Sequence, residues 1–277
     1  MLFLFFILFQ LFYSIQSQLT CHNCPRGSNI FNTIITADTI PENLKDCTLI
    51  SEQMECSIHV TWTQNPNQTI LMLMPGGERN KISNRYNLQN TITLTNNGSQ
   101  LQWTKSLEFI CSTEQCNSPI TLKRLLKSLK SDDSFYTLSQ LLEINNQFHG
   151  NLCNFFANSS MPCETEMDQN TCKQCATQEY IESKPVEVCS NCVMDDIIEN
   201  FITRQVKFFM NNRERHDMWM IECQQRGCNA IETGDLIRQK SDIQFDFDLF
   251  LNNGNNKFKD ISSICLLFLV FMKIFYL

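Results

Sequence analysis

Four cysteines in the second half of the chain have a spacing that could bind zinc. Cys172 and Cys175 form one C-x2-C pair, and Cys189 and Cys192 form another after 13 intervening residues. Zinc binds such cysteines as thiolates, whereas an oxidising secretory compartment converts them to disulfides. A thioredoxin-like redox role would need a βαβ pattern around a C-x-x-C pair, and neither pair has one. We therefore predict no metal ion and no other cofactor.

The complete set of cysteines favours a disulfide framework. The chain of 277 residues has 15 cysteines, and Cys265 lies in an apolar C-terminal tail. If that tail is removed, an even set remains that can pair completely. We predict disulfides at Cys21, Cys24, Cys47, Cys56, Cys111, Cys116, Cys153, Cys163, Cys172, Cys175, Cys189, Cys192, Cys223 and Cys228.

The other reactive residue types do not form a recognisable catalytic set. The four histidines, His22, His59, His149 and His216, lie in separate segments, and the sequence has no G-x-S-x-G, H-E-x-x-H or phosphate-binding glycine motif. We predict that the protein is not an enzyme. The alternative is an extracellular hydrolase with dispersed catalytic residues, in which one histidine would meet a serine and a carboxylate, or an unpaired cysteine.

The first residues carry an export signal. Residues 1–18 contain no charged side chain and are largely apolar from Leu2 to Tyr13. We interpret them as a signal peptide that is cleaved near Ser17 or Gln18. An uncleaved anchor is the alternative, although the run is short for a membrane span.

The last residues predict attachment to a membrane. The run 264–277 is apolar except for Lys273, and it follows a polar spacer at 255–263 and small residues that begin at Asn252. This order is typical of a glycosylphosphatidylinositol signal, so we predict that 253–277 is removed and that Asn252 receives the lipid. A short type I transmembrane anchor is the alternative. Because the tail contains three lysines and one aspartate, its removal would move the net charge from −7 to about −9, which disfavours nucleic-acid binding.

The cysteines fall into two groups that suggest two modules. Six lie between residues 21 and 116, and eight lie between 153 and 228. Each stretch is long enough for one small disulfide-supported core. The predicted divisions are a first module at 19–117, a helical connector at 118–152, a second cysteine-rich module at 153–229 and a stalk at 230–252.

The first module reads as β structure. Ser57–Thr63 alternates apolar and polar residues, as a half-buried strand does, and a polar turn separates it from a second strand at Thr69–Pro75. Thr91–Thr95 and Gln100–Thr104 flank an Asn97–Gly98 pair, which is a strong signal for a tight turn. We therefore expect two β-hairpins.

The connector reads as helical. Leu122, Leu125, Leu126 and Leu129 recur at helical spacing, and a second run carries Phe135, Leu138, Leu141 and Leu142. We expect two helices that pack on the modules. Because lysines and an arginine occupy the other faces of the first run, a basic amphipathic helix that touches a membrane is the alternative.

The second module is of mixed α/β character by its sequence. Val193–Val206 fits a helix with Ile197, Ile198, Phe201 and Ile202 on one stripe. The segments VKFFM and MWMIEC instead indicate a hairpin that leads into Cys223. The module is either a shortened β unit with an inserted helix or a different fold.

One short motif occurs twice. Cys111–Asn117 and Cys223–Asn229 both read C-x4-C-N, with no intervening residue retained. A disulfide holds two Cα atoms about 4.4–6.8 Å apart, whereas five extended steps would span about 17 Å, so such a ring forces a sharp reversal. Many polar sequences can make that reversal. An asparagine can donate and accept hydrogen bonds, and we predict that it ties the chain to neighbouring backbone groups.

The two ends of the first module resemble those of a known family. Leu19-Thr20-Cys21-His22-Asn23-Cys24 and the closing Cys111–Asn117 are similar to the opening and closing motifs of the three-finger domain family of the lymphocyte antigens and the urokinase receptor. The resemblance implies a disulfide hub with three β loops, and the bonds Cys111–Cys116, Cys24–Cys47 and Cys21–Cys56. Ile110 departs from the family, which has a second cysteine there, and the first module has fewer cysteines than the family commonly has.

In the second half only the closing motif fits the family well. Cys172 and Cys175 would open that module, with Cys189, Cys192, Cys223 and Cys228 following in the order of the first module. Cys153 and Cys163 would then form an extra bond. Family members act as receptors, as ion-channel modulators and as inhibitors of assembly at membranes, and the residues do not select among these roles.

Three N-x-S/T sequons predict glycosylation, at Asn67, Asn97 and Asn158. Asn67 and Asn97 fall in the two predicted hairpin turns. We therefore expect a cell-surface, lipid-anchored glycoprotein that binds another extracellular or membrane protein through disulfide-anchored β loops, and no small-molecule substrate. A type I membrane or secreted structural glycoprotein without a dedicated ligand is the alternative, beside the hydrolase named above.

Overall fold

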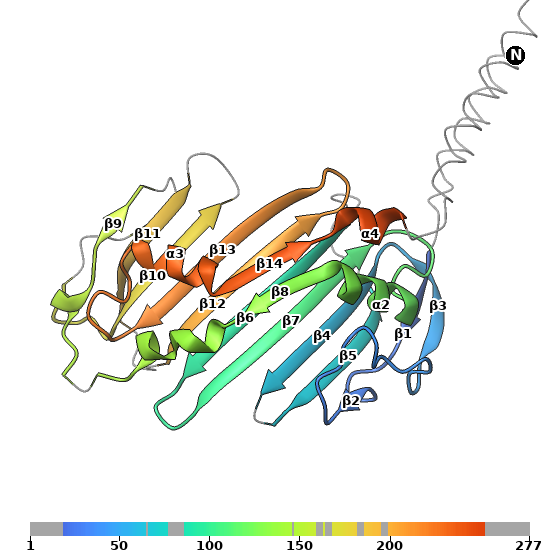
Figure 1. The fold of residues 1–277 in the computed structure, drawn as a ribbon, viewed down its shortest axis with the longest axis horizontal. Helices are drawn as coiled ribbons and strands as arrows, with labels where there is room; N and C mark the ends of the chain where they lie inside the picture. The colour runs from blue at the N-terminus through green and yellow to red at the C-terminus, as the bar shows by residue number, and fades with distance from the viewer. Residues whose placement is uncertain are drawn as a thin grey trace, which may run out of the picture.

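Strands from both halves of the chain join in one antiparallel sheet (Figure 1). The computed structural model describes residues 19–64, 66–76, 86–145, 147–158, 163, 168–181, 186–194 and 199–252. Ten strands lie in the order β2, β5, β4, β7, β6, β12, β13, β10, β11, β9. The disulfide-rich, mainly β fold class that the sequence predicts is confirmed.

The first half supplies one side of this sheet. Its strands there are β2 (Ile30–Phe31), β4 (Cys56–Gln64), β5 (Gln68–Pro75), β6 (Asn87–Asn96) and β7 (Leu101–Cys111). The two predicted hairpins are β4–β5 and β6–β7. Gly98 in the second turn has a φ of 84°, which glycine adopts without strain. A separate two-stranded ribbon contains β1 (Leu19–Asn23) and β3 (Thr48–Gln53).

The second half supplies the other side. Its strands are β9 (Phe156–Ala157), β10 (Gln174–Ile181), β11 (Glu187–Val193), β12 (Asn200–Phe209) and β13 (Glu214–Cys223). The β12–β13 hairpin agrees with the hairpin that we expected before Cys223. The helical reading of Val193–Val206 is wrong, because burial along β12 alternates at every second residue. Ile197 and Ile198 lie outside the described residues.

The two halves meet edge to edge. β6 pairs with β12 along its whole length, from Asn87 opposite Phe209 to Asn96 opposite Asn200. Outward from this junction the strands follow in matching order, β7, β4, β5, β2 on one side and β13, β10, β11, β9 on the other. The sheet therefore has an approximate two-fold axis at the junction of β6 and β12.

Two arms cover one face of the sheet. The first arm, residues 118–142, contains α2 (Pro119–Ser128), β8 (Leu129–Asp133) and the 3-10 helix η1 (Phe135–Leu142). The second arm, residues 230–252, contains α3 (Glu232–Gln239), β14 (Ser241–Phe245) and α4 (Phe247–Asn252). β8 and β14 pair antiparallel above the sheet. A short 3-10 helix, η2 (Gly150–Leu152), precedes β9.

The arms cross from one half to the other. α4 of the second arm packs on α2, and the Phe250 ring lies 5.7 Å from that of Phe109 in β7. At the other end, the Asn200 side chain of β12 donates a hydrogen bond to the Leu142 carbonyl of the first arm, at 3.1 Å. The second arm therefore begins on its own half and ends on the first half, whereas the first arm ends over the junction of β6 and β12.

The arms correct two expectations. Residues 230–252 do not form a stalk, because Ile237, Ile243 and Phe250 are buried in the shared core. The described part of the connector is helical in α2, in η1 and in the short η2, and it contains the unexpected strand β8. Leu129, which the leucine spacing assigns to a helix, begins that strand, because pairing with β14 outweighs the local helical pattern.

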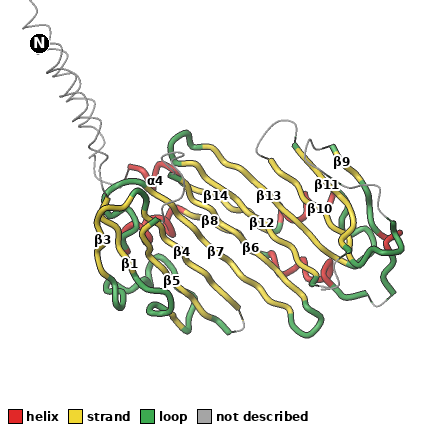
Figure 2. The backbone as a smooth tube through the Cα atoms, turned by 180° about the vertical axis from the view of Figure 1, so that it is seen from behind, coloured by secondary structure: helices red, strands yellow, loops and turns green. Residues whose placement is uncertain are grey.

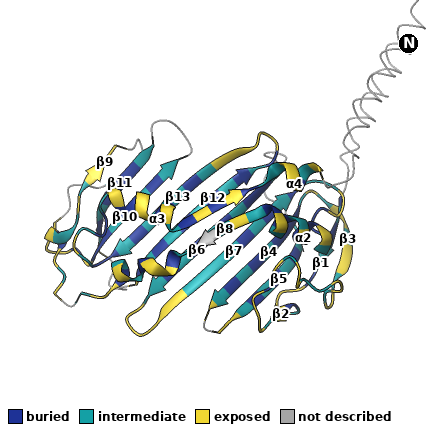
Figure 3. Cartoon of the chain, in the orientation of Figure 1, coloured by how far each residue is buried: buried dark blue, intermediate teal, exposed yellow. Residues whose placement is uncertain are grey.

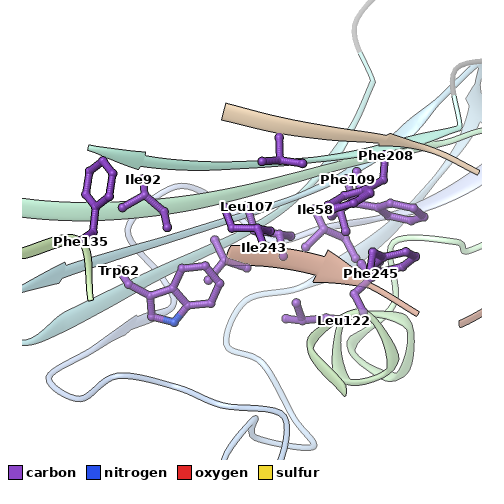
Figure 4. Packing of buried hydrophobic residues seen from close by; sticks show 14 of the residues in the cluster. Ile58, Trp62, Ile92, Leu107, Phe109, Leu122, Phe135, Phe208, Ile243 and Phe245 are labelled. Carbon is purple, nitrogen blue, oxygen red and sulfur yellow. The ribbon is translucent and has the colours of Figure 1, made fainter. Parts of the chain in front are cut away.

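The apolar core lies between the sheet and the arms. Burial alternates along the strands, so that one face of each is enclosed (Figure 3). In Figure 4, Ile58, Leu107 and Phe109 of the sheet lie close to Leu122 and Ile243 of the two arms. Both arms therefore contribute to one continuous core.

Candidate functional site

Disulfides hold both halves at the ends of their hairpins. The first half contains Cys21–Cys56, Cys24–Cys47 and Cys111–Cys116, which are the bonds that the family resemblance implies. The second half contains Cys153–Cys175, Cys163–Cys189, Cys172–Cys192 and Cys223–Cys228. A Cys153–Cys163 bond is therefore wrong. The four cysteines with zinc-like spacing are all in disulfides, and the seven bonds together indicate an extracellular or secreted protein.

The two closing asparagines make the same set of hydrogen bonds. The Asn117 side chain accepts from His22 N at 2.9 Å and donates to the carbonyls of His22, Ser57 and Met74. The Asn229 side chain accepts from Asn154 N at 2.9 Å and donates to the carbonyls of Asn154, Ala176 and Asn191. Both asparagines are fully buried. Each one ties three segments of its half together, as the repeated motif predicts.

These contacts relocate the opening of the second half. Asn154 takes the place of His22, so Cys153 corresponds to Cys21 and Cys175 to Cys56. The opening therefore lies at Cys153, and the assignment of this role to Cys172 is wrong. The C-x2-C spacing suggested Cys172, but the contact with the closing asparagine, which the sequence does not show, defines the position.

An ionic cluster lies under the second arm. Arg204 of β12 is 2% exposed, and it binds both oxygens of Asp217 on β13, at 3.1 and 2.6 Å. Its third nitrogen donates to Ser241 and to the Arg238 carbonyl. Arg215 contacts the same carboxylate at 2.9 Å. This guanidinium therefore joins the sheet of the second half to the second arm.

A second carboxylate extends this cluster. Glu179 of β10 is 4% exposed and accepts from the Trp219 indole at 2.8 Å. Its other oxygen lies 2.6 Å from Arg238, which also binds Asp235. A Cβ atom at Gly234 of α3 would lie 2.5 Å from the Trp219 ring, so only glycine lets the helix approach this closely. Sequence analysis missed the whole cluster, because its members are far apart along the chain.

The opposite face of the sheet is uncovered by the arms (Figure 2). Side chains on this face are half-exposed, and the two halves contribute to one surface at the junction of β6 and β12. The Thr93 and Thr203 hydroxyls lie 3.0 Å apart across that junction. Met218 and Met220 of β13 continue the same rows. We call this surface the open face; its central residues are Thr91, Thr93, Thr203, Gln205, Met218 and Met220.

Two of the four histidines lie on the open face, and every cysteine in the described part of the chain is in a disulfide. His59 lies 3.6 Å from Glu108 on the neighbouring strand, and burial lowers the His59 pKa although Glu108 opposes the shift. His216 stacks on Phe209 with ring centroids 4.6 Å apart. Burial also lowers the pKa of His22, whose backbone bonds with the Asn117 side chain in the first half. His149 precedes η2 in another part of the fold.

The predicted modification sites are all at the surface. Asn67 and Asn97 are exposed in the turns that end the β4–β5 and β6–β7 hairpins. Asn158 is also exposed, but its side chain bonds with Val186 and Val188 backbone groups at 3.1 and 2.7 Å. Asn252 is exposed at the end of α4. Within the described ranges, no group of histidine, cysteine and acidic side chains could hold a metal ion, and no helix has the length and apolar character that crossing a bilayer requires.

No family model, no curated protein and no solved structure matches this chain.

Proposed function

We propose that this protein is a non-enzymatic cell-surface glycoprotein that binds another extracellular or membrane protein. The observation that carries the proposal is the asymmetry of the sheet, in which one face is covered by both arms and the other is left open. A broad face with methionine, threonine and glutamine side chains at its centre fits a protein partner better than it fits a small substrate.

We further propose that each half is a three-finger-like domain. The paired end motifs, the disulfide bonds of the first half and the shared asparagine contacts support this proposal. The departures are the edge-to-edge junction and the long arms. In this proposal the hairpin turns of one half lie beside the disulfides of the other; for example, a Cβ atom at Gly98 would lie 3.5 Å from the Ile144 side chain.

Within the β loops that the sequence suggested, the open face is the proposed contact surface, rather than the loop tips. Glycans on Asn67 and Asn97 would shield two of those tips. The open face has none of the three sequons among its central residues, and it joins both halves in one surface. Strand addition at the sheet edges is disfavoured, because the edge strands β2 and β9 are only two residues long.

Binding to intact cells tests the proposal. A fluorescent, tetramerised form of residues 19–252 should bind in a saturable way to cells of the same source, and protease treatment of the cells should remove the binding. M218K together with M220K should lower the binding at least tenfold. The matched control, I34K together with L49K, also adds two lysines at exposed apolar positions off the open face. Equal loss in both variants, or no saturable binding, would contradict the proposal.

The proposed lipid anchor has a separate test. Treatment of intact cells with a phosphatidylinositol-specific phospholipase should release the protein into the medium. Retention on the cells after treatment, with release of a known lipid-anchored control, would favour a transmembrane anchor.

A further inference from the structure

The outer side of α2 is basic in an acidic protein. Lys123 and Lys127 are exposed, and Ile120 before them is 80% exposed. These three residues recur at helical spacing and share one side of the helix, opposite the buried Leu122 and Leu125. The helix contains no acidic residue, whereas the whole chain has a net charge of −7. We call Ile120, Lys123 and Lys127 the α2 outer face.

The chain leaves the described fold beside this face. α4 packs on α2, and the Arg124 guanidinium lies 4.8 Å from the centre of the Phe250 ring. α4 ends at Asn252, and both helices lie on the arm side of the sheet at the same end of the molecule (Figure 1). Asp248 on α4 is paired with Arg213 at 3.0 Å, so its charge is partly balanced.

The sequence after Asn252 brings this end of the fold to a bilayer. In the proposed lipid-anchored form, the lipid is attached at Asn252 itself. In the alternative, residues 253–263 join α4 to the apolar run 264–277, and eleven residues reach at most about 40 Å. In both cases α2 stays close to the membrane surface.

We propose that the α2 outer face rests on the phosphate headgroups of the membrane in which the chain is anchored. This inference rests on the proposed membrane attachment, but not on the protein partner. The lysines bind lipid phosphates, and Ile120 inserts among the headgroups. The open face, which lies on the other side of the sheet, is then turned away from the membrane and toward a partner.

Vesicle binding tests this contact without the natural anchor. The probe is a chain that ends at Asn252, which retains every described element, followed by a histidine tag that binds a nickel-chelating lipid. On vesicles with one fifth phosphatidylserine, the protein should be retained at lower nickel-lipid density than on pure phosphatidylcholine. K123Q together with K127Q should lower the preference for the anionic vesicles roughly 25-fold, because each lysine near an anionic surface contributes roughly fivefold to the binding constant.

A charge-matched variant controls for net charge. Lys45 and Lys173 are also exposed but are not part of α2, and K45Q together with K173Q should leave vesicle retention within twofold of the original. Equal losses in both variants, or no preference for anionic vesicles in the original protein, would overturn the proposal. If K123Q with K127Q reduces only the binding of the tetramer to cells, then α2 contacts a protein and the membrane assignment is wrong. Loss of binding in M218K with M220K alone bears on the partner and leaves this contact intact.

Discussion

The two halves of the molecule share a hub and a strand order but enclose different chemistry. In the first half, Leu71, Val60, Leu107 and Asn90 form one row across the covered face of the sheet. The matching row of the second half contains Val188, Glu179, Trp219 and Arg204. A row of three aliphatic side chains and one amide thus corresponds to a row with two opposite charges.

The arms account for this difference. α2 places Leu122 and Leu125 over the first half, whereas the second arm places Arg238 and Ser241 over the second half. Because the closing asparagines and disulfides already fix the hairpins, the side chains between sheet and arm are free to be either apolar or ionic. The disulfides and closing asparagines therefore set the shape of each half. The side chains of each arm must match the polarity of the sheet side chains that they cover.

The largest expected effect comes from breaking the ionic row. Arg204→Ala should lower the free energy of unfolding by about 5 kcal/mol, because it leaves Asp217 buried with only the partly exposed Arg215 and removes the bonds to Ser241. Urea unfolding checks this value. The double variant R204M with D217L should recover most of the loss, and an equally severe loss in the double variant would show that the charges themselves are needed.

Because the second arm ends on the first half, a change in that arm should also destabilise the protein. Phe250→Ala should destabilise the protein by about 4 kcal/mol, because the ring is 1% exposed and packs on Phe109 of the other half. Hydrogen exchange should show faster exchange in β7 and α2. The control is Leu249→Ala, whose side chain on the same helix is 36% exposed. Faster exchange confined to β10–β13 would contradict the crossing.

Loss of either closing asparagine should lower the stability of the protein by a similar amount. Asn117→Ala and Asn229→Ala should each cost about 2–3 kcal/mol, since each leaves buried backbone groups without partners. Thermal unfolding of both variants measures the effect. A cost that differs more than twofold between them would break the proposed equivalence of the halves.

Asn90 offers a stabilising change. It corresponds to Arg204, is fully buried, and neither of its side-chain polar atoms has a hydrogen-bond partner in the described part of the chain. Asn90→Leu should stabilise the protein by about 1 kcal/mol, because it removes an unpaired buried amide. A lower midpoint in urea for this variant would show that the amide is satisfied in solution.

The smallest expected effect is a pH dependence in the first half. Burial lowers the pKa of His59 and of His22 from 6.5, so the unfolded chain binds more protons than the folded chain near that pH. Stability is then complete above pH 6.5 and falls as the pH drops below it. His59→Gln should flatten this slope in thermal unfolding between pH 7 and pH 5. An unchanged slope would exclude His59 as its source.

The hairpins and the closing rings could be predicted from the sequence because their signals are local. Alternation from Ser57 to Thr63 and the Asn97–Gly98 turn lie within a few residues of the structure that they specify. The pairing of β8 with β14 could not be predicted, because Leu129–Asp133 is short and polar and its partner lies more than 100 residues away. The bond between Arg204 and Ser241 could not be predicted either, because the two residues lie in different elements that only the fold brings together.

The pairing of β6 with β12 also could not be predicted from the sequence. Both strands have the ordinary alternation of a half-buried strand, which does not distinguish an edge from a paired position. The opening at Cys153 was missed because its partner in space is the closing asparagine, and only the fold brings them together.

The position of α4 determines how a mechanical load would pass through the molecule. Tension on the chain beyond Asn252 acts first on a helix that is packed against α2 and held by Phe250 in the core of the first half. The pulling force therefore bypasses the hairpins nearest in sequence and is shared by both halves. A tethered molecule of this design should yield in one step, rather than unravel from its attached end.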